Sequence, residues 1–404
     1  MNRFPLIALV VAVVASGTTA IAPTATAAPS VQYGVGSTAL ANPSAGGRYL
    51  YVSTSGTDSY KQYSRIPCLR DPASKPPYQD ACPEPTASAP LRTVQAAVRS
   101  ARAGDVIVIR AGTYSEAVGW GITRGTSSRP IVMQAAPAER VVISGTLIMS
   151  SPDYWTVQGI RFVYNSAVQK NGQAVVLMSG GIGWRFRNNE VTGSTGVANL
   201  LVNATTATGT AGELRAAAPR EYQIAGNCIH DNRAAGTQGT DHNIYLMSSI
   251  YSTGGVIERN LIAGAPRGSN IKASGSTPST ASGSPRNVSI RYNTMLAAAS
   301  GLTIGLQAQA VESQYNLIAM PAGSGPYDGA VKTYQLAAPG TNSAKDSLLS
   351  GYTRPVSEDY GASVHLFTAR NDTKTAFSYT GSVANCTARA ASATTLAKYG
   401  QYAG

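Results

Sequence analysis

The chain has 404 residues, of which 13% are charged, and 32 Lys and Arg against 20 Asp and Glu give it a net charge of +12. Its 41 glycines argue against a helix-rich fold, because a glycine inside a helix costs about 1 kcal/mol relative to alanine. This net positive charge suits binding to an anionic partner such as an acidic polysaccharide, a cell-wall polymer or nucleic acid, although it can equally serve solubility alone.

The first 28 residues have the pattern of a secretory signal peptide. Arg3 supplies a positive charge, residues 4–15 form an apolar run, and small residues at 25–27 make a cleavage site. No other segment approaches the roughly 18 apolar residues that a membrane helix needs. We therefore expect a secreted, extracellular protein without a membrane span, whose Pro-, Ser- and Gly-rich residues 29–47 form a loose leader.

Four cysteines in an exported chain predict disulfides. Cys68 and Cys82 are close in sequence and are expected to pair, which leaves Cys228 for Cys386 by elimination. The chain has three histidines and no Cys-x-x-Cys motif, which argues against a zinc site.

Strands and turns dominate the rest of the chain. Residues 48–53 alternate as a strand, and residues 56–90 form a polar loop. Residues 91–101 carry apolar side chains at helical spacing and stop before Gly104, which makes them the one helix expected. Residues 106–110 form the next strand.

From residue 154 onward the chain repeats a short alternating strand that ends at a recurring position. That position holds Gly159 in the first copy and asparagine in the later ones, namely Asn189, Asn227, Asn260, Asn293 and Asn316. The intervals are 30, 38, 33, 33 and 23 residues, as expected for coils of one minimum size with loops of different length. Asparagine tolerates left-handed backbone and can bond its stacked neighbours, so we expect a ladder of amides in a solenoid of parallel strands.

The stretch from Tyr49 to about Met320 resembles the pectate-lyase-like superfamily. The resemblance rests on Tyr-Val-Ser-Thr-Ser-Gly-Thr-Asp at 51–58, on the helix at 93–101, and on Ala-Gly-Asp-Val-Ile-Val-Ile-Arg-Ala-Gly-Thr-Tyr at 103–114. It implies an all-β fold, a right-handed parallel β-helix (a solenoid) with an N-terminal capping helix. We expect a single domain over 48–404, with the cap and first coil at 48–114, further coils at 115–320, and the last coils and a covering C-terminal segment at 321–404.

The candidate site lies where two repeats meet. His-Asn-Ile-Tyr at 242–245 and Ser-Asn-Ile-Lys at 269–272 share one pattern, and Tyr245 and Lys272 are 27 residues apart. If the two strands stack, these two side chains stand about 4.8 Å apart on one face, enough for one sugar ring between them. Long loops bring cationic and aromatic side chains to the same coils, namely Arg220, Arg233, His242, Tyr245, Arg267, Lys272 and Arg286.

The resemblance extends to polysaccharide lyases similar to alginate lyase and chondroitinase B, which act on uronic-acid polymers with a Lys and Arg pair. Lys272, with Arg267 or Arg286, occupies positions that match this pair. In β-elimination an Arg neutralises the uronate carboxylate, Lys272 removes the C5 proton if its pKa is lowered, and Tyr245 or His242 protonates the leaving oxygen. We assign Lys272, His242, Tyr245 and Arg267 to catalysis. Substrate binding is assigned to Arg220, Arg233, Asn243, Asn270 and Arg286.

Several alternatives stay open. A uronate epimerase would share the proton abstraction, a glycoside hydrolase would use acids such as Asp231, Asp241 and Glu258, and a non-catalytic protein would only bind the polymer. Each site residue could also be an ordinary solvated or packing side chain. The sequence lacks the full acidic calcium pattern of the similar lyases, so a Ca2+ requirement is left open, and no organic cofactor is expected. The expected partner is an acidic polysaccharide rather than nucleic acid, bound by a monomer.

Overall fold

The computed structural model describes residues 33–37, 39–58, 85–169, 174–233, 241–275, 283–320, 329–336, 342–352, 354–358, 367–370, 373–374, 378–391 and 393–401. They belong to one compact unit, Gln32–Gly404. The predicted signal peptide and the predicted Cys68–Cys82 pair lie outside the described residues. Among the residues described, no helix is long and apolar enough to cross a membrane.

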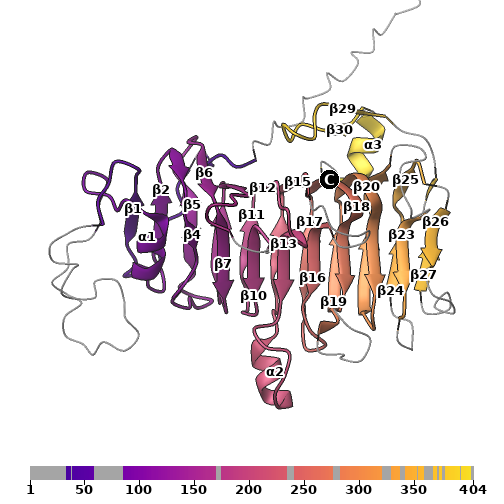
Figure 1. Cartoon of the computed structure of the whole chain (residues 1–404), viewed down its shortest axis with the longest axis horizontal. Helices are drawn as coiled ribbons and strands as arrows, with labels where there is room; N and C mark the ends of the chain where they lie inside the picture. Colours follow the sequence, from indigo (N-terminus) through magenta and orange to yellow (C-terminus); the bar gives the residue numbers. More distant parts are fainter. Residues whose placement is uncertain are drawn as a thin grey trace, which may run out of the picture. The chain divides into compact units, whose positions relative to one another are not determined.

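The unit is a parallel β-helix, as expected, in which each turn of chain adds a strand to each of three columns (Figure 1). The first column is the 11-stranded sheet. The second and third columns together form the 17-stranded sheet and are joined because β18 and β20 run through both.

The first column contains β1 (Tyr49–Val52), β2 (Val106–Ile109), β5 (Ile131–Ala135), β8 (Trp155–Gln158), β11 (Arg185–Arg187), β14 (Gln223–Ala225), β17 (Gly255–Glu258), β19 (Arg286–Arg291), β21 (Gln309–Gln314), β24 (Asn342–Lys345) and β27 (Phe367–Arg370). The second contains β3 (Gly112–Tyr114), β6 (Val141–Ser144), β9 (Arg161–Val163), β12 (Glu190–Thr192), β15 (Cys228–His230), the first parts of β18 (Leu261–Ser274) and β20 (Thr294–Gly305), β22 (Leu317–Ala319), β25 (Leu348–Ser350) and β28 (Thr373–Lys374). The third contains β4 (Ala117–Val118), β7 (Thr146–Ser150), β10 (Val176–Ser179), β13 (Ala198–Asn203), β16 (His242–Met247), the last parts of β18 and β20, β23 (Gly329–Tyr334) and β26 (Arg354–Glu358).

An asparagine ladder holds the corner between the first and second columns, as predicted. Asn227 donates its amide to Asn260 (2.9 Å), Asn260 donates to Asn293 (2.9 Å) and Asn293 donates to Asn316 (3.0 Å). All of these side chains are fully buried. One detail of the prediction is corrected: the left-handed residue is the one before each asparagine, such as Arg259 with φ of 54°. The asparagine therefore contributes its hydrogen bonds and not a left-handed backbone conformation.

Three helices occur among the described residues. The expected helix is present as α1 (Val94–Ser100), with Thr93 as its N-cap and Val94, Ala96, Ala97 and Val98 buried. The prediction of a single helix was wrong, because α2 (Ala211–Ala217) and α3 (Ala393–Lys398) also form. The capping box of Thr210 and Glu213, which satisfies the first backbone donors of α2, was the sequence signal for this short helix.

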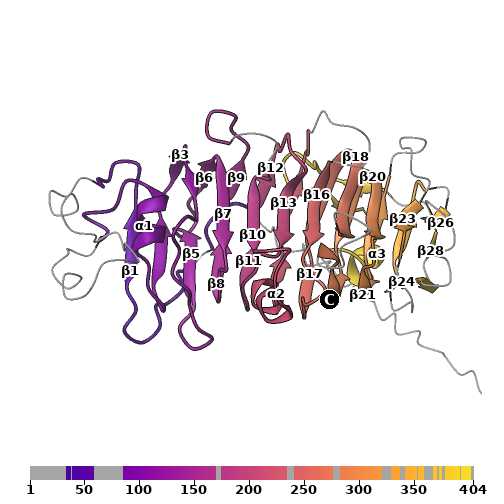
Figure 2. The ribbon, with the colours of Figure 1, turned by 60° about the horizontal axis from the view of Figure 1, so that its bottom comes forward.

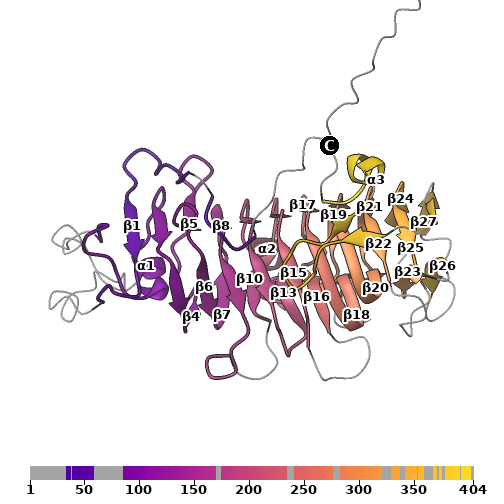
Figure 3. The same ribbon diagram turned by 90° about the horizontal axis from the view of Figure 1, so that it is seen from above.

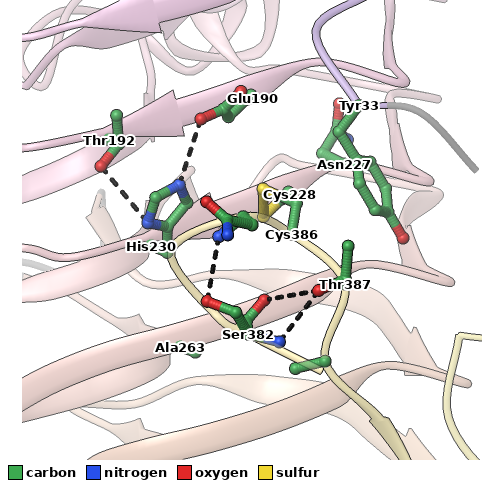
Figure 4. The surroundings of a disulfide bond; sticks show 12 residues. Tyr33, Glu190, Thr192, Asn227, Cys228, His230, Ala263, Ser382, Cys386 and Thr387 are labelled. Carbon is green, nitrogen blue, oxygen red and sulfur yellow. Dashed lines mark hydrogen bonds and ion pairs between the residues drawn. A yellow bond between two sulfur atoms is a disulfide. The ribbon is translucent and has the colours of Figure 1, made fainter. Parts of the chain in front are cut away.

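The C-terminal segment folds back over the second column. It contains the antiparallel pair β29 (Tyr379–Thr380) and β30 (Arg389–Ala390), together with α3 (Figure 1). The disulfide between Cys228 and Cys386 ties it to β15, and Tyr33 from the described part of the predicted leader packs in the same apolar cluster (Figure 4). The pairing inferred by elimination is thus confirmed, and residue 33 is not loose.

Replacement of Asn260 by Ala should lower the free energy of unfolding by about 2–4 kcal/mol, because Asn227 and Asn293 lose buried partners and a cavity opens. Urea unfolding followed by circular dichroism measures the change. Asn385→Ala, at an exposed position, is the matched control and should change stability by less than about 0.5 kcal/mol. Equal effects of the two substitutions would contradict a stabilising ladder.

Candidate active site on the third column

A row of outward side chains crosses the third column. Tyr245 is in register with Lys272, Lys272 with Thr303, and Thr303 with Lys332. On β16, Tyr245 alternates with the core residues Ile244 and Leu246 and so points to the outside. The strands β16, β18, β20 and β23 follow one another in Figure 2. The expected juxtaposition of Tyr245 and Lys272 is confirmed, and we call the four residues the lysine row.

Lys272 is the half-buried centre of this row. Its Nζ lies 4.8 Å from the centroid of the Tyr245 ring. Burial, and secondarily the positive charge of Lys332, lower the pKa of Lys272 from 10.5 to about 8. A sizeable fraction of this amine is therefore uncharged at mildly alkaline pH, as a general base requires.

Tyr245 keeps its phenolic proton. Its hydroxyl donates to the carbonyl oxygen of Gly275 (3.2 Å). Burial, and secondarily Tyr334, raise the pKa of Tyr245 above its usual value. Tyr334 shares a hydrogen bond of 2.6 Å with the hydroxyl of Ser274. The phenol of Tyr245 is thus neutral, and its ring faces the Lys272 amine.

His242 lies at the edge of the row. Its Nδ1 accepts the backbone N–H of Ser269 (3.1 Å), so the proton of a neutral ring is on Nε2. The ring packs edge-on against Tyr245, with 5.2 Å between centroids. Only 2% of His242 is exposed, which makes Tyr245 the better placed of the two predicted donors.

Arg267 and Arg233 meet elsewhere, at the turn between the second and third columns. They line a hollow of about 600 Å³ together with Asp231, Asn232 and Pro266. The backbone N–H of Arg267 donates to Asp241 Oδ2 (3.2 Å). The structure therefore brings these two predicted cations together, but in a separate hollow whose lining does not include Lys272.

Arg220 and Arg286 lie at the other side of the third column, where the chain enters the first column. Arg220 forms isolated bridges with Ile182 and Thr253. Arg286 begins β19, and burial lowers its pKa. Neither arginine is part of the lysine row.

Asn243 and Asn270 lie inside the coils and not at the surface. Asn199 donates to Asn243 Oδ1 (2.8 Å) and Asn243 donates to Asn270 Oδ1 (2.9 Å), so the three form a second ladder. All are 0% exposed. They hold the strands that carry Tyr245 and Lys272, and we leave both out of the substrate-contacting residues.

Lys332 was not among the predicted site residues, and it is buried at the far end of the row. The sequence did contain a signal for this residue. In Ala330-Val331-Lys332, as in Ile271-Lys272, a lysine directly follows an apolar strand residue. Thr303 stands between them and shares a 2.6 Å hydrogen bond with Ser269.

The lysine row does not fit a Ca2+ site. Ca2+ takes six to eight oxygen ligands, several from carboxylates, whereas the outward positions described on β16, β18, β20 and β23 carry no Asp or Glu. Elsewhere in the described part of the chain, Cys228, His230 and Cys386 cluster within ligand distance. The two sulfurs are bonded to each other, so they are not available to a metal.

Comparisons with known proteins agree with this architecture. A family model described as chondroitinase B matches residues 89–206. Pectate lyase PEL9 of Emericella nidulans is 41% identical over 68 residues, which are 17% of this chain and 17% of that protein. The chain is similar to the parallel β-helix polysaccharide lyases.

Two of the solved structures that are similar to this chain are polysaccharide lyases. Pectate lyase Pel9A has a TM-score of 0.49 and 12% identity, and the match covers 80% of both chains. An alginate lyase from Paenibacillus sp. has a TM-score of 0.43 and 16% identity, with 70% of this chain and 96% of that chain covered.

Replacement of Lys332 by Met should raise the pKa of Lys272, because a neighbouring positive charge is removed. The value should stay below 10.5, since burial is the larger cause. Only the uncharged amine reacts with acetic anhydride, and peptide mass spectrometry measures the acetylation of Lys272. This acetylation should rise with pH through about 8 in the original protein and at higher pH in the variant. Lys345→Met, on the first column, is the control, and an equal shift there would contradict the interpretation.

Proposed function

We propose that this protein is a secreted lyase that cleaves a uronic-acid polysaccharide by β-elimination at the lysine row. The proposal rests chiefly on the Lys272 amine, whose pKa is about 8 and which lies between a phenol and a second cation. The similarity to polysaccharide lyases supports the reaction class. The chain acts as a monomer on an extracellular polymer.

Lys332 takes the role that the sequence analysis gave to an arginine. Lys272 and Lys332 are two strand steps apart, or about 9–10 Å at the usual strand spacing. A uronate ring over Thr303 and Lys272 would place its carboxylate toward Lys332. Pairing with this cation withdraws negative charge from the carboxylate and makes the C5 proton more acidic.

The elimination then needs one base and one acid. The uncharged amine of Lys272 takes the C5 proton, the C4–C5 double bond forms, and the C4–O4 bond breaks with its electron pair left on O4. The phenol of Tyr245 donates its proton to that oxygen, and the raised pKa keeps the phenol protonated until this step. Transfer of the proton from Lys272 to the Tyr245 phenolate, directly or through a water molecule, restores both groups.

The other functions find less support among the described residues. Glu258 lies on the first column, ion-paired with Arg291 (2.9 Å), and Asp231 is bonded to His230 (3.0 Å). Asp241 accepts the backbone N–H of Arg267. Each of these acids thus already binds another group of the chain, whereas hydrolysis uses a pair of carboxylates that face the substrate. An epimerase would share the base, and a binding protein would not need the lowered pKa of Lys272.

The purified protein should release unsaturated uronate ends, seen as ultraviolet absorbance, from one of pectate, alginate, glucuronan or a glycosaminoglycan. Lys272→Met should lower kcat/KM by about 10²–10⁴-fold, because the general base is lost. Activity of the original protein should rise with pH through about 8, as the amine loses its proton.

Lys345→Met is the charge-matched control and should retain full activity. A flat absorbance trace with new reducing ends would favour the hydrolase, and retention on a polymer column with no new ends would favour a binding protein. Unchanged activity of Lys272→Met would refute Lys272 as the base.

A further inference from the structure

The lysine row continues toward the N-terminal coils as an apolar strip. Tyr245 is in register with Leu201, Leu201 with Leu177, and Leu177 with Ile148. Each of these three apolar side chains is only partly buried. The strands that carry them, β7, β10 and β13, follow β4 and lead to β16 in Figure 3. The outer surface thus changes from cationic to apolar along one line of strands.

Trp120 lies at the far end of this strip. In the pairing of β4 with β7, Val118 lies beside Leu147. The residues that follow them, Gly119 and Ile148, are therefore also neighbours. A Cβ at Gly119, whose φ is +106°, would collide with the Ile148 carbonyl oxygen, so glycine permits this close approach. The following Trp120 is 56% exposed.

The backbone of Trp120 is held in place although its side chain is exposed. Gln95 of α1 donates to the Trp120 carbonyl oxygen (2.7 Å) and accepts the N–H groups of Gly119 (2.8 Å) and Trp120 (3.3 Å). The exposed indole leaves a large apolar ring face in water, where it lacks the free energy that burial would give. Such a side chain is a ready platform for a ligand.

We propose that Trp120 is a distal sugar-binding platform for the same polysaccharide chain that reacts at the lysine row. The inference rests on the proposed function for the identity of the polymer. Five strand steps separate Gly119 from Lys272 through Ile148, Leu177, Leu201 and Tyr245, which is about 24 Å. Several linked sugar rings span this distance.

The chemistry of the strip defines what it recognises. Ile148, Leu177 and Leu201 offer no cation to a carboxylate, so sugars over them are held by the apolar C–H faces of their rings, and Trp120 stacks on the last of them. The carboxylate that is recognised is the one at Lys272 and Lys332. The site therefore favours a long polysaccharide over a short one. It requires a carboxylate at the reacting sugar ring alone.

Tryptophan fluorescence tests this directly. The chain has three tryptophans, and Trp155 and Trp184 are 0% exposed, so a change of emission on ligand addition reports Trp120. The Lys272→Met variant prevents turnover during titration with pectate, alginate, glucuronan, a glycosaminoglycan and their trisaccharides. We expect one polymer to shift the emission and to protect it from acrylamide quenching, whereas its trisaccharide does neither. The signal should vanish in a Lys272→Met, Trp120→Phe double variant.

Kinetics with the original Lys272 give a second test. Trp120→Ala should raise KM for the polymer about 3- to 10-fold with kcat unchanged, because stacking far from the reacting ring binds ground state and transition state equally. Activity on the trisaccharide should not change, and Trp120→Phe should restore most of the loss. Tyr379→Ala, at another exposed aromatic residue (43%), is the control and should leave KM unchanged.

The outcomes separate this inference from the proposed function. Polymer binding that alters Trp120 emission without any cleavage would support the platform and refute the lyase. Cleavage with unaltered emission and an unchanged KM in Trp120→Ala would refute the platform alone. Absence of binding to all four polymers would also overturn the platform.

Discussion

The lateral register of the coils is the constraint on which the rest of the structure depends. The buried asparagine ladders bond the central coils to one another, and parallel pairing fixes which residue stands beside which. Because alternate residues of a strand point outward, a residue type placed at the same position of successive coils becomes a continuous row on the surface. Such a row is formed by Tyr245, Lys272, Thr303 and Lys332, although 86 residues of the chain lie between the first and the last.

The row combines two features that are unfavourable without a ligand. Burial disfavours the protonated, charged form of Lys272, and the positive charge of Lys332 disfavours it further. A uronate carboxylate next to the two amines weakens the repulsion between them, since its charge is opposite to theirs. The same burial leaves the Lys272 amine able to accept a proton near pH 8. Recognition of the anion and activation of the base thus have one physical origin.

The sequence predicted the repeated features well and the turns poorly. The 27-residue interval correctly placed Tyr245 beside Lys272, and the recurring asparagines correctly predicted the ladder. Lys332 was missed because the steps from Lys272 to Thr303 and on to Lys332 are 31 and 29 residues, so no constant interval reveals them. Arg267 was grouped with Lys272, five residues away, because the irregular register of β18 between Ala265 and Ser269 is not visible in the sequence.

The central claim is that a uronate ring binds over Lys272 with its carboxylate at Lys332. A crystal structure of the Lys272→Met variant with an oligosaccharide of the polymer that it binds tests this most directly. The account predicts a sugar carboxylate within hydrogen-bonding distance of Lys332 Nζ, with C5 above residue 272 and the bridging oxygen next to the hydroxyl of Tyr245. An oligosaccharide bound only in the hollow of Arg233 and Arg267, with the lysine row uncovered, would contradict it.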